Sequence, residues 1–254
     1  MTAKDDYEAF LACRHGPAHG RRTADRWAAF LRPHLRPGMR LLDLGCGPGS
    51  ITAGLAGDGV APVGIDRSPV RIEGIPVAGA DGASLPFPAA SFDALYANAL
   101  LQHVPDPLAV LREARRVARP GAVIGVGDAD WDGVLSHPSD PHLERGHAIR
   151  EALRPDGDVR VGRKLRGLLA AAGFERAEVS ATAAAEGSDE AVRRLAAFEG
   201  SWFAVPEVIT YVAELGLADP DEMASIAAAW DAWAADPGAM VARFWITAIA
   251  WAPA

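Results

Sequence analysis

The sequence has few cysteines, no long apolar run and no excess of positive charge. Cys13 and Cys46 are its only cysteines, too few for a disulfide framework. No apolar stretch approaches the roughly 18 residues of a membrane-spanning helix, and the start, MTAKDDYEAF, lacks a signal-peptide pattern. The formal net charge of −8 disfavours a nucleic-acid partner, which would require a basic surface. We therefore expect a cytoplasmic protein that acts on small molecules.

The length of 254 residues suits one α/β domain with an appended element. We predict a single domain over residues 1–254, as a monomer or a homodimer. Its parts are a helical cap at 1–35, an α/β core at 36–182, a helical insertion at 183–238 and a last strand at 239–254.

A glycine-rich turn marks the start of the core. The run LLDLGCGPGS, residues 41–50, reads as a buried strand followed by glycines at alternate positions. These glycines are Gly45, Gly47 and Gly49. Asp43 lies at the mouth of the turn, where its carboxylate can orient N–H groups of the loop. A dinucleotide fingerprint would need glycine or alanine at Ser50, and a phosphate-binding loop would need Gly-Lys-Ser/Thr. Both are absent, which argues against a bound phosphate.

The pattern Asp-x-Gly-x-Gly-x-Gly at 43–49 resembles the first motif of class I S-adenosylmethionine-dependent methyltransferases. Two longer segments, RRTADRWAAFLRPHLRPGMRLLDLGCGPGSIT and LPFPAASFDALYANALLQHVPDPLAVLREARRVARPGAVIGVGD, resemble the ubiquinone and menaquinone biosynthesis type, called type 11. The resemblance covers roughly residues 21–182. It implies S-adenosylmethionine as cofactor, S-adenosylhomocysteine as product, and cofactor contacts at Gly45, Gly47, Asp66, Asp81 and near Asn98.

Several of these residues follow expected strands, at the end where ligands sit in open α/β sheets. Asp66 follows the second strand, where a carboxylate can accept both ribose hydroxyls of the cofactor. Its neighbour Arg67 is predicted to lie along the adenine. Asp81, with Gly82 beside it, follows the third strand and is predicted to accept the adenine amino group. Asn98 ends the fourth.

Arg22 is predicted to pair with the amino-acid carboxylate of the cofactor, because a guanidinium fork matches a carboxylate. The alternative interpretation is a surface arginine. His103, just beyond the fourth strand, and His19, in the cap, are candidate general bases because histidine titrates near neutrality. We predict no metal site, since the histidines at 137, 142 and 147 are expected in a Pro-rich loop without a carboxylate or cysteine frame.

The expected fold is a Rossmann-like seven-stranded, mostly parallel sheet with helices on both faces and an antiparallel last strand. The last strand is Met240–Trp251. Some fifty residues with helical periodicity and capping signals precede it and form the predicted insertion.

The predicted function is methyl transfer to a small, apolar or ring-containing metabolite, by in-line displacement at the sulfonium methyl. Two alternatives stay open. The glycine turn and the acidic residue after the second strand also occur in nicotinamide-dependent oxidoreductases, and a member of the same fold can bind a ligand or catalyse a rearrangement without methylating.

Overall fold

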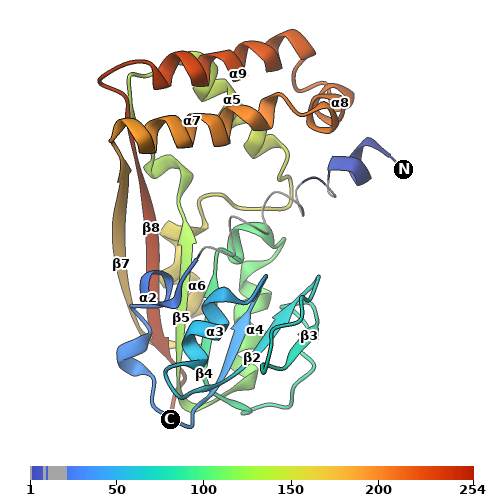
Figure 1. Cartoon of the computed structure of the whole chain (residues 1–254). Helices are drawn as coiled ribbons and strands as arrows, with labels where there is room; N and C mark the ends of the chain where they lie inside the picture. The colour runs from blue at the N-terminus through green and yellow to red at the C-terminus, as the bar shows by residue number, and fades with distance from the viewer. Residues whose placement is uncertain (1, 8–9, 11–21) are drawn as a thin grey trace. The chain divides into compact units, whose positions relative to one another are not determined.

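The computed structural model describes residues 2–7, 10 and 22–254 (Figure 1). Contacts between residues divide the chain into two units. The helical unit comprises Met1–Arg14, Trp131–Pro155 and Ala183–Phe244, and the sheet unit comprises His15–Asp130, Asp156–Thr182 and Trp245–Ala254. Strands β7 and β8 contribute residues to both units. The prediction of a single domain over 1–254 stays a prediction.

The sheet unit is built on parallel strands. The parallel strands are β1 (Arg40–Leu44), β2 (Ala61–Asp66), β3 (Val77–Gly79), β4 (Phe92–Asn98) and β5 (Ala118–Ala129). Two further strands, β7 (Glu175–Glu186) and β8 (Met240–Trp251), follow later in the chain. Their spatial order is β3-β2-β1-β4-β5-β8, with β7 paired to β8. β1 is parallel to both β2 and β4, whereas β8 is antiparallel to β5 (Figure 1). The predicted mostly parallel α/β fold is confirmed.

Alternation along the strands places apolar side chains on both faces of the sheet. Leu41 packs in a cluster with Leu31 and Leu55, whereas its neighbour Leu42 packs in a second cluster with Leu111. The first cluster draws on α2 (Ala24–Trp27) and α3 (Ser50–Ala56), and the second on α4 (Pro107–Val117), the 3₁₀ turn η4 (Val161–Lys164) and α6 (Leu165–Ala171). Helices therefore cover both faces, and the polar strand ends are left for a ligand.

The helical unit contains α5 (Pro141–Ala152), α7 (Asp189–Phe203), α8 (Pro206–Glu214), α9 (Pro220–Ala234) and the short strand β6 (Leu135–His137). Gly146 of α5 lies so close to α7 that a Cβ there would come within 2.7 Å of the Phe203 ring. A Cβ on Gly200 would lie 3.0 Å from Trp230 of α9. Glycine thus permits close helix contacts within this unit. No helix in the described part of the chain is both long and apolar enough to cross a bilayer.

Two elements of the helical unit were not predicted from the sequence. The Pro-rich segment is not a loop, because His142 and His147 lie on helix α5 and His137 lies in strand β6. β6 pairs with the start of β8 and brings the sheet to eight strands instead of seven. Within the described ranges, no group of three or more His, Cys, Asp or Glu side chains is placed to hold a metal ion.

Gly162 in η4 is expected to tolerate no side chain. A Cβ there would lie 2.8 Å from the backbone oxygen of Ala129 and 3.0 Å from the Ile246 side chain. Because backbone cannot move away cheaply, Gly162→Ala should lower the free energy of unfolding by about 1 to 3 kcal/mol in urea denaturation. Gly167→Ala is the matched control: it lies in α6 with nothing within 4 Å, and should raise stability by up to about 1 kcal/mol. Equal stabilities would contradict the packing.

Candidate functional site

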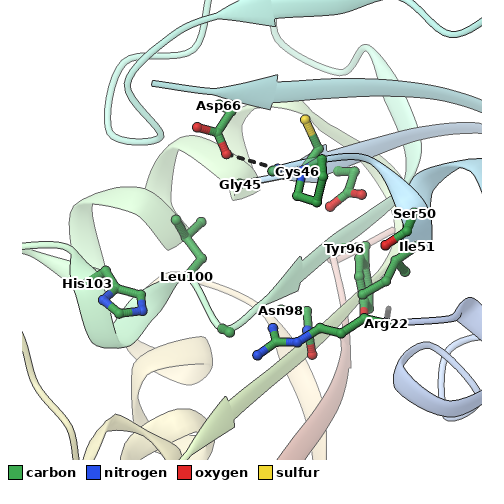
Figure 2. A pocket seen from close by; sticks show the side chains of 14 residues that line it. Arg22, Gly45, Cys46, Ser50, Ile51, Asp66, Tyr96, Asn98, Leu100 and His103 are labelled. Atoms are coloured by element: carbon green, nitrogen blue, oxygen red, sulfur yellow. Dashed lines mark hydrogen bonds between the residues drawn. The ribbon is translucent and has the colours of Figure 1, made fainter. Parts of the chain in front are cut away.

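A cavity of about 210 Å³ lies at the carboxyl ends of β1, β2 and β4 (Figure 2). Its walls are formed by Arg22, Asp43, Gly45, Cys46, Gly47, Pro48, Ser50, Ile51, Asp66, Tyr96, Asn98, Ala99, Leu100 and His103. A single water needs only about 10 to 15 Å³, so the cavity is too large for a packing defect. β1 lies between β2 and β4, where the strand order of the sheet reverses. Open α/β sheets bind ligands at this position.

The glycine turn forms one wall. Gly45, Gly47 and Gly49 have φ of +71°, +51° and +79°, values that side-chain-bearing residues rarely adopt. The N–H groups of Gly45 and Cys46 both donate to the Ile65 carbonyl, at 2.8 and 3.0 Å, which ties the turn to β2. At Gly47 a Cβ would meet nothing within 4 Å, whereas at Gly49 it would strike Ile72. The backbone at Gly47 is therefore open to a ligand.

Two carboxylates support this turn in different ways. Asp66 is half-buried, and its two oxygens accept N–H bonds from Gly47 at 3.0 Å and Ser68 at 2.9 Å. Asp43 is buried and accepts a 2.5 Å hydrogen bond from the Thr52 hydroxyl. Burial, opposed by the Thr52 hydrogen bond and reinforced by the nearby Asp66 charge, raises the pKa of Asp43 to about 7. Asp43 therefore holds β1 to α3, while Asp66 retains lone pairs for a ligand.

Arg22 forms part of the opposite wall (Figure 2). Its guanidinium lies 4.7 Å from the Trp27 ring centroid and 5.8 Å from that of Trp245. Burial lowers the pKa of Arg22, opposed by electrostatic interactions with Tyr96 and Asp128. No carboxylate among residues 22–254 forms an ion pair with it. The result is a guanidinium held between aromatic rings at the cavity wall.

Tyr96 fixes the segment that carries Arg22. Its hydroxyl donates to the Trp27 carbonyl at 2.8 Å, and its ring lines the cavity. Burial raises the pKa of Tyr96 far above its usual range, so the phenol stays neutral and a donor. Tyr96 was not predicted as a site residue, although its position on the predicted fourth strand, two residues before Asn98, was a signal.

Asn98, at the end of β4, contributes a buried side-chain amide to this wall. It is 8% exposed, yet neither its amide oxygen nor its amide nitrogen has a hydrogen-bond partner among the described residues. The same holds for the indole N–H of Trp245. That N–H and the Asn98 oxygen lie 2.8 and 2.9 Å from where a Cβ on Gly127 would be. Because buried polar groups are nearly always paired, the Asn98 amide is a candidate ligand contact. Trp245, which was not predicted, is not among the residues of the cavity wall.

His103 lies away from Arg22 in Figure 2, beside Leu100. It is exposed and ends the 3₁₀ turn η2 (Leu101–His103). Asp128 fixes this turn, because its fully buried carboxylate accepts the Gln102 N–H at 3.2 Å. Burial raises the pKa of Asp128 to about 7, against the backbone hydrogen bonds that lower it. The position of His103 thus depends on a carboxylate of β5.

Not every predicted residue lines the cavity. Arg67 and Asp81 form an exposed ion pair at 2.9 Å, and neither belongs to the cavity wall. Gly82 is also outside it, and a Cβ there would contact Val110 of α4 at 3.3 Å. Their roles toward adenine stay predictions. His19 lies outside the described residues.

The family model described as "Methyltransferase domain" matches residues 18–179, which include the whole cavity wall. The chain belongs to this methyltransferase family. Its α/β fold is also shared with solved methyltransferases. The match favours the predicted methyltransferase over the oxidoreductase alternative.

Relatives of this methyltransferase differ in what their names say they act on. The present chain is 39% identical over 122 residues to 27-O-demethylrifamycin SV methyltransferase of Amycolatopsis mediterranei. The match covers 42% of this chain and 44% of that protein. The fold is shared with the [4+2]-cyclase SpnF, at TM-score 0.53, 22% identity and coverage of 92% and 84%. It is shared also with Haemonchus contortus phosphoethanolamine N-methyltransferase 2 in complex with S-adenosylhomocysteine, at TM-score 0.51, 15% identity and coverage of 89% and 52%.

The chain spans about half the length of the curated relatives that it matches. Most of the helical unit lies outside the family match.

The cavity of this methyltransferase fits S-adenosylmethionine. The cofactor carries a carboxylate, an amino group and two ribose hydroxyls. Within residues 22–254, the wall offers a guanidinium without an ion pair, an amide without a hydrogen bond and a carboxylate with spare lone pairs. These belong to Arg22, Asn98 and Asp66. The uncovered backbone at Gly47 leaves room for the close approach that the glycine turn permits.

Proposed function

We propose that the chain transfers a methyl group from S-adenosylmethionine to a small-molecule acceptor, an apolar or ring-containing metabolite. The observation that carries this is the buried amide of Asn98, which has no hydrogen-bond partner in the described part of the chain and lines the same cavity as Arg22 and the glycine turn. A structural cavity would leave these polar groups unsatisfied at a cost of about 1 to 3 kcal/mol each. A bound cofactor satisfies them.

Each wall residue has a role in this proposal. Arg22 binds the cofactor carboxylate, Asn98 hydrogen-bonds the amino-acid end, and Asp66 accepts the ribose hydroxyls while holding the Gly47 N–H. Arg67 and Asp81 are proposed to lie toward the adenine, as a pair. When bound, the cofactor supplies an electrophilic methyl group on a positively charged sulfur.

The chain's own contribution is mainly alignment. Holding two reactants in line can supply about 7 to 11 kcal/mol, whereas a general base adds about 10²- to 10⁴-fold. His103 is proposed to take the proton of an oxygen or acidic-carbon acceptor, since it lies on the cavity wall and is exposed. His19 stays a second candidate base.

Calorimetry with S-adenosylhomocysteine tests the cofactor, and incubation of methyl-labelled cofactor with acceptor extracts tests transfer. We expect micromolar or tighter binding and a labelled small-molecule product. Absence of binding to folded protein would contradict the cofactor site. Tight binding without labelled product would favour a non-methylating member of the fold. Cytoplasmic location and a monomeric or homodimeric state are part of the proposal.

Asp66→Ala is expected to weaken S-adenosylhomocysteine binding about 5- to 150-fold, equivalent to 1 to 3 kcal/mol. The reason is that ribose hydroxyls and the Gly47 N–H lose one shared acceptor. Asp106→Ala is the matched control, because Asp106 also accepts a backbone N–H, from Ala109 at 2.9 Å, but lies off the cavity. Calorimetry should show affinity lost in the first variant alone. Unchanged affinity in both would remove Asp66 from the site.

A further inference from the structure

Three neighbouring strands of the sheet unit meet at a glycine beside the cavity. Asn98 of β4 pairs in register with Gly127 of β5, and Gly127 pairs with Thr247 of β8. Residues two apart on a strand face the same side of the sheet, so Trp245 lies on the same face as Thr247. All four residues belong to the sheet unit. The missing side chain of Gly127 leaves a space on this face that the Asn98 and Trp245 side chains both reach.

This space brings two polar atoms close together. A Cβ on Gly127 would lie 2.8 Å from the Trp245 indole nitrogen and 2.9 Å from the Asn98 amide oxygen. An indole N–H can only donate a hydrogen bond and an amide oxygen can only accept one. Both atoms are buried, and neither has a hydrogen-bond partner among the described residues. A bond from the indole N–H to the amide oxygen would therefore satisfy both atoms.

Trp245 also lies against the arginine of the cavity wall. The Arg22 guanidinium is 5.8 Å from the centroid of the Trp245 ring, and the Trp27 ring meets that ring edge-on at 4.8 Å. Arg22 and Asn98 both line the cavity, on the same side of it in Figure 2. Trp245 is outside the wall, yet it is placed to orient both of these side chains.

The orientation of the Asn98 amide decides which ligand group it can bind. When the amide oxygen accepts the Trp245 N–H, the amide nitrogen is the end that is left for a ligand, and it carries two N–H donors. Arg22 adds the donors of a charged guanidinium on the same wall. Donors of this kind bind an anion and repel a cation. The amino-acid end of the cofactor offers one anionic group, its carboxylate, beside a positively charged amino group.

We propose that the Asn98 amide donates to the cofactor carboxylate together with Arg22, and that Trp245 is the positioning residue that holds the amide in this orientation. The inference rests on the proposed function and names the group of the cofactor that Asn98 binds. In the bound state the Trp245 N–H donates to the amide oxygen, and the amide N–H groups point to the carboxylate. Gly127 makes this possible, because a side chain there would push the two atoms apart.

Calorimetry on the full chain tests the proposal with S-adenosylhomocysteine and two analogues of it. In one analogue hydrogen replaces the carboxylate, and in the other hydrogen replaces the amino group. The ratio of each analogue's Kd to that of S-adenosylhomocysteine gives a carboxylate preference and an amino preference. The wild type should show a carboxylate preference of about 100-fold or more, and Asn98→Ala should lower it about 10-fold, the loss of one hydrogen bond to a charged group. The amino preference should stay at the wild-type value.

Trp245→Phe isolates the indole N–H, because it keeps an aromatic ring beside Arg22. It should lower the carboxylate preference about 3- to 10-fold, the effect of one neutral hydrogen bond, and leave the affinity for the analogue without a carboxylate unchanged. Trp251→Phe is the matched control. Trp251 also lies on β8 with an arginine over its ring, Arg176 at 4.5 Å, but it is not on the cavity wall. This variant should keep the wild-type preference.

Three results would overturn the proposal. A fall of the amino preference in Asn98→Ala, with the carboxylate preference kept, would mean that the amide oxygen binds the amino group. An unchanged carboxylate preference in Trp245→Phe would remove Trp245 as a positioning residue. An equal loss of affinity for all three ligands in either variant would mean that the side chain only supports the fold. If the folded wild type does not bind S-adenosylhomocysteine, the proposed function itself falls, whereas binding with any of these three results defeats this inference alone.

Discussion

Replacing Arg22 by alanine should weaken the binding of S-adenosylhomocysteine about 10- to 150-fold in calorimetry, the loss expected for hydrogen bonds to a charged group. The effect should be large because the guanidinium is already in place. Trp27 and Trp245 hold it at 4.7 and 5.8 Å from their ring centroids. Little side-chain entropy is therefore lost when a carboxylate binds.

Burial strengthens the expected pair further. The pKa of Arg22 is lowered by burial, which shows that water screens the charge less there than at the surface. Asp128 attracts this guanidinium without forming a recorded ion pair with it. No carboxylate of residues 22–254 forms an ion pair with Arg22, so a bound carboxylate of the cofactor would be its first direct anionic partner in this part of the chain.

Arg26→Ala is the matched control for Arg22→Ala. The Arg26 guanidinium also lies against Trp27, at 5.5 Å, but its side chain is exposed and outside the cavity wall. Arg22→Lys should fall between wild type and alanine, because it keeps the charge and loses the bidentate fork. If Arg22→Ala and Arg26→Ala bind S-adenosylhomocysteine equally well, Arg22 does not bind the cofactor carboxylate.

Most of the sheet unit could be predicted because its elements carry local signals. The pair Asp106-Pro107, for example, predicts the start of α4. In the structure Asp106 is the N-cap of this helix, and its carboxylate accepts the Ala109 N–H. Helix α5 was missed although Asp140 caps it in the same way. Its inward face includes Gly146, where contact with Phe203 leaves no room for a side chain. The apolar periodicity that marks a helix is therefore weakened at the point of closest packing.

The candidate site shows a similar division. Asp66 and Asn98 could be placed because each ends a strand that the sequence delimits, and both lie on the cavity wall. Trp245 could not be placed, because its neighbours depend on the antiparallel register that sets it opposite Ala129. Treating Asp81 as free to bind adenine also overlooked a spatial partner, Arg67 at 2.9 Å. Sequence spacing locates strand ends but not the lateral pairs between them.

Asp43 should make the protein less stable as the pH rises. Its native pKa of about 7 lies above the usual aspartate pKa of 3.8, so between these values the native state holds a proton that the unfolded state has released. The free energy of unfolding then falls with increasing pH across this window and levels off above it. At about 1.4 kcal/mol per pKa unit, the loss from Asp43 is on the order of 2 to 4 kcal/mol between pH 4 and pH 8.

Asp43→Asn isolates this contribution. Its amide oxygen can still accept the Thr52 hydroxyl, the recorded hydrogen bond of Asp43, while the titration is removed. Urea denaturation from pH 4 to pH 8 should therefore show a flatter decline than in the wild type, with the remaining decline due in part to Asp128, whose pKa is also raised to about 7. Asp81→Asn should leave the decline between pH 4 and pH 8 close to that of the wild type, because the Ala83 N–H and then Arg67 lower the pKa of Asp81, so this carboxylate is ionised in both the folded and the unfolded state across most of that range. Parallel profiles for wild type and Asp43→Asn would mean that Asp43 is ionised in the folded protein across this range, and that its burial is compensated by groups other than Thr52.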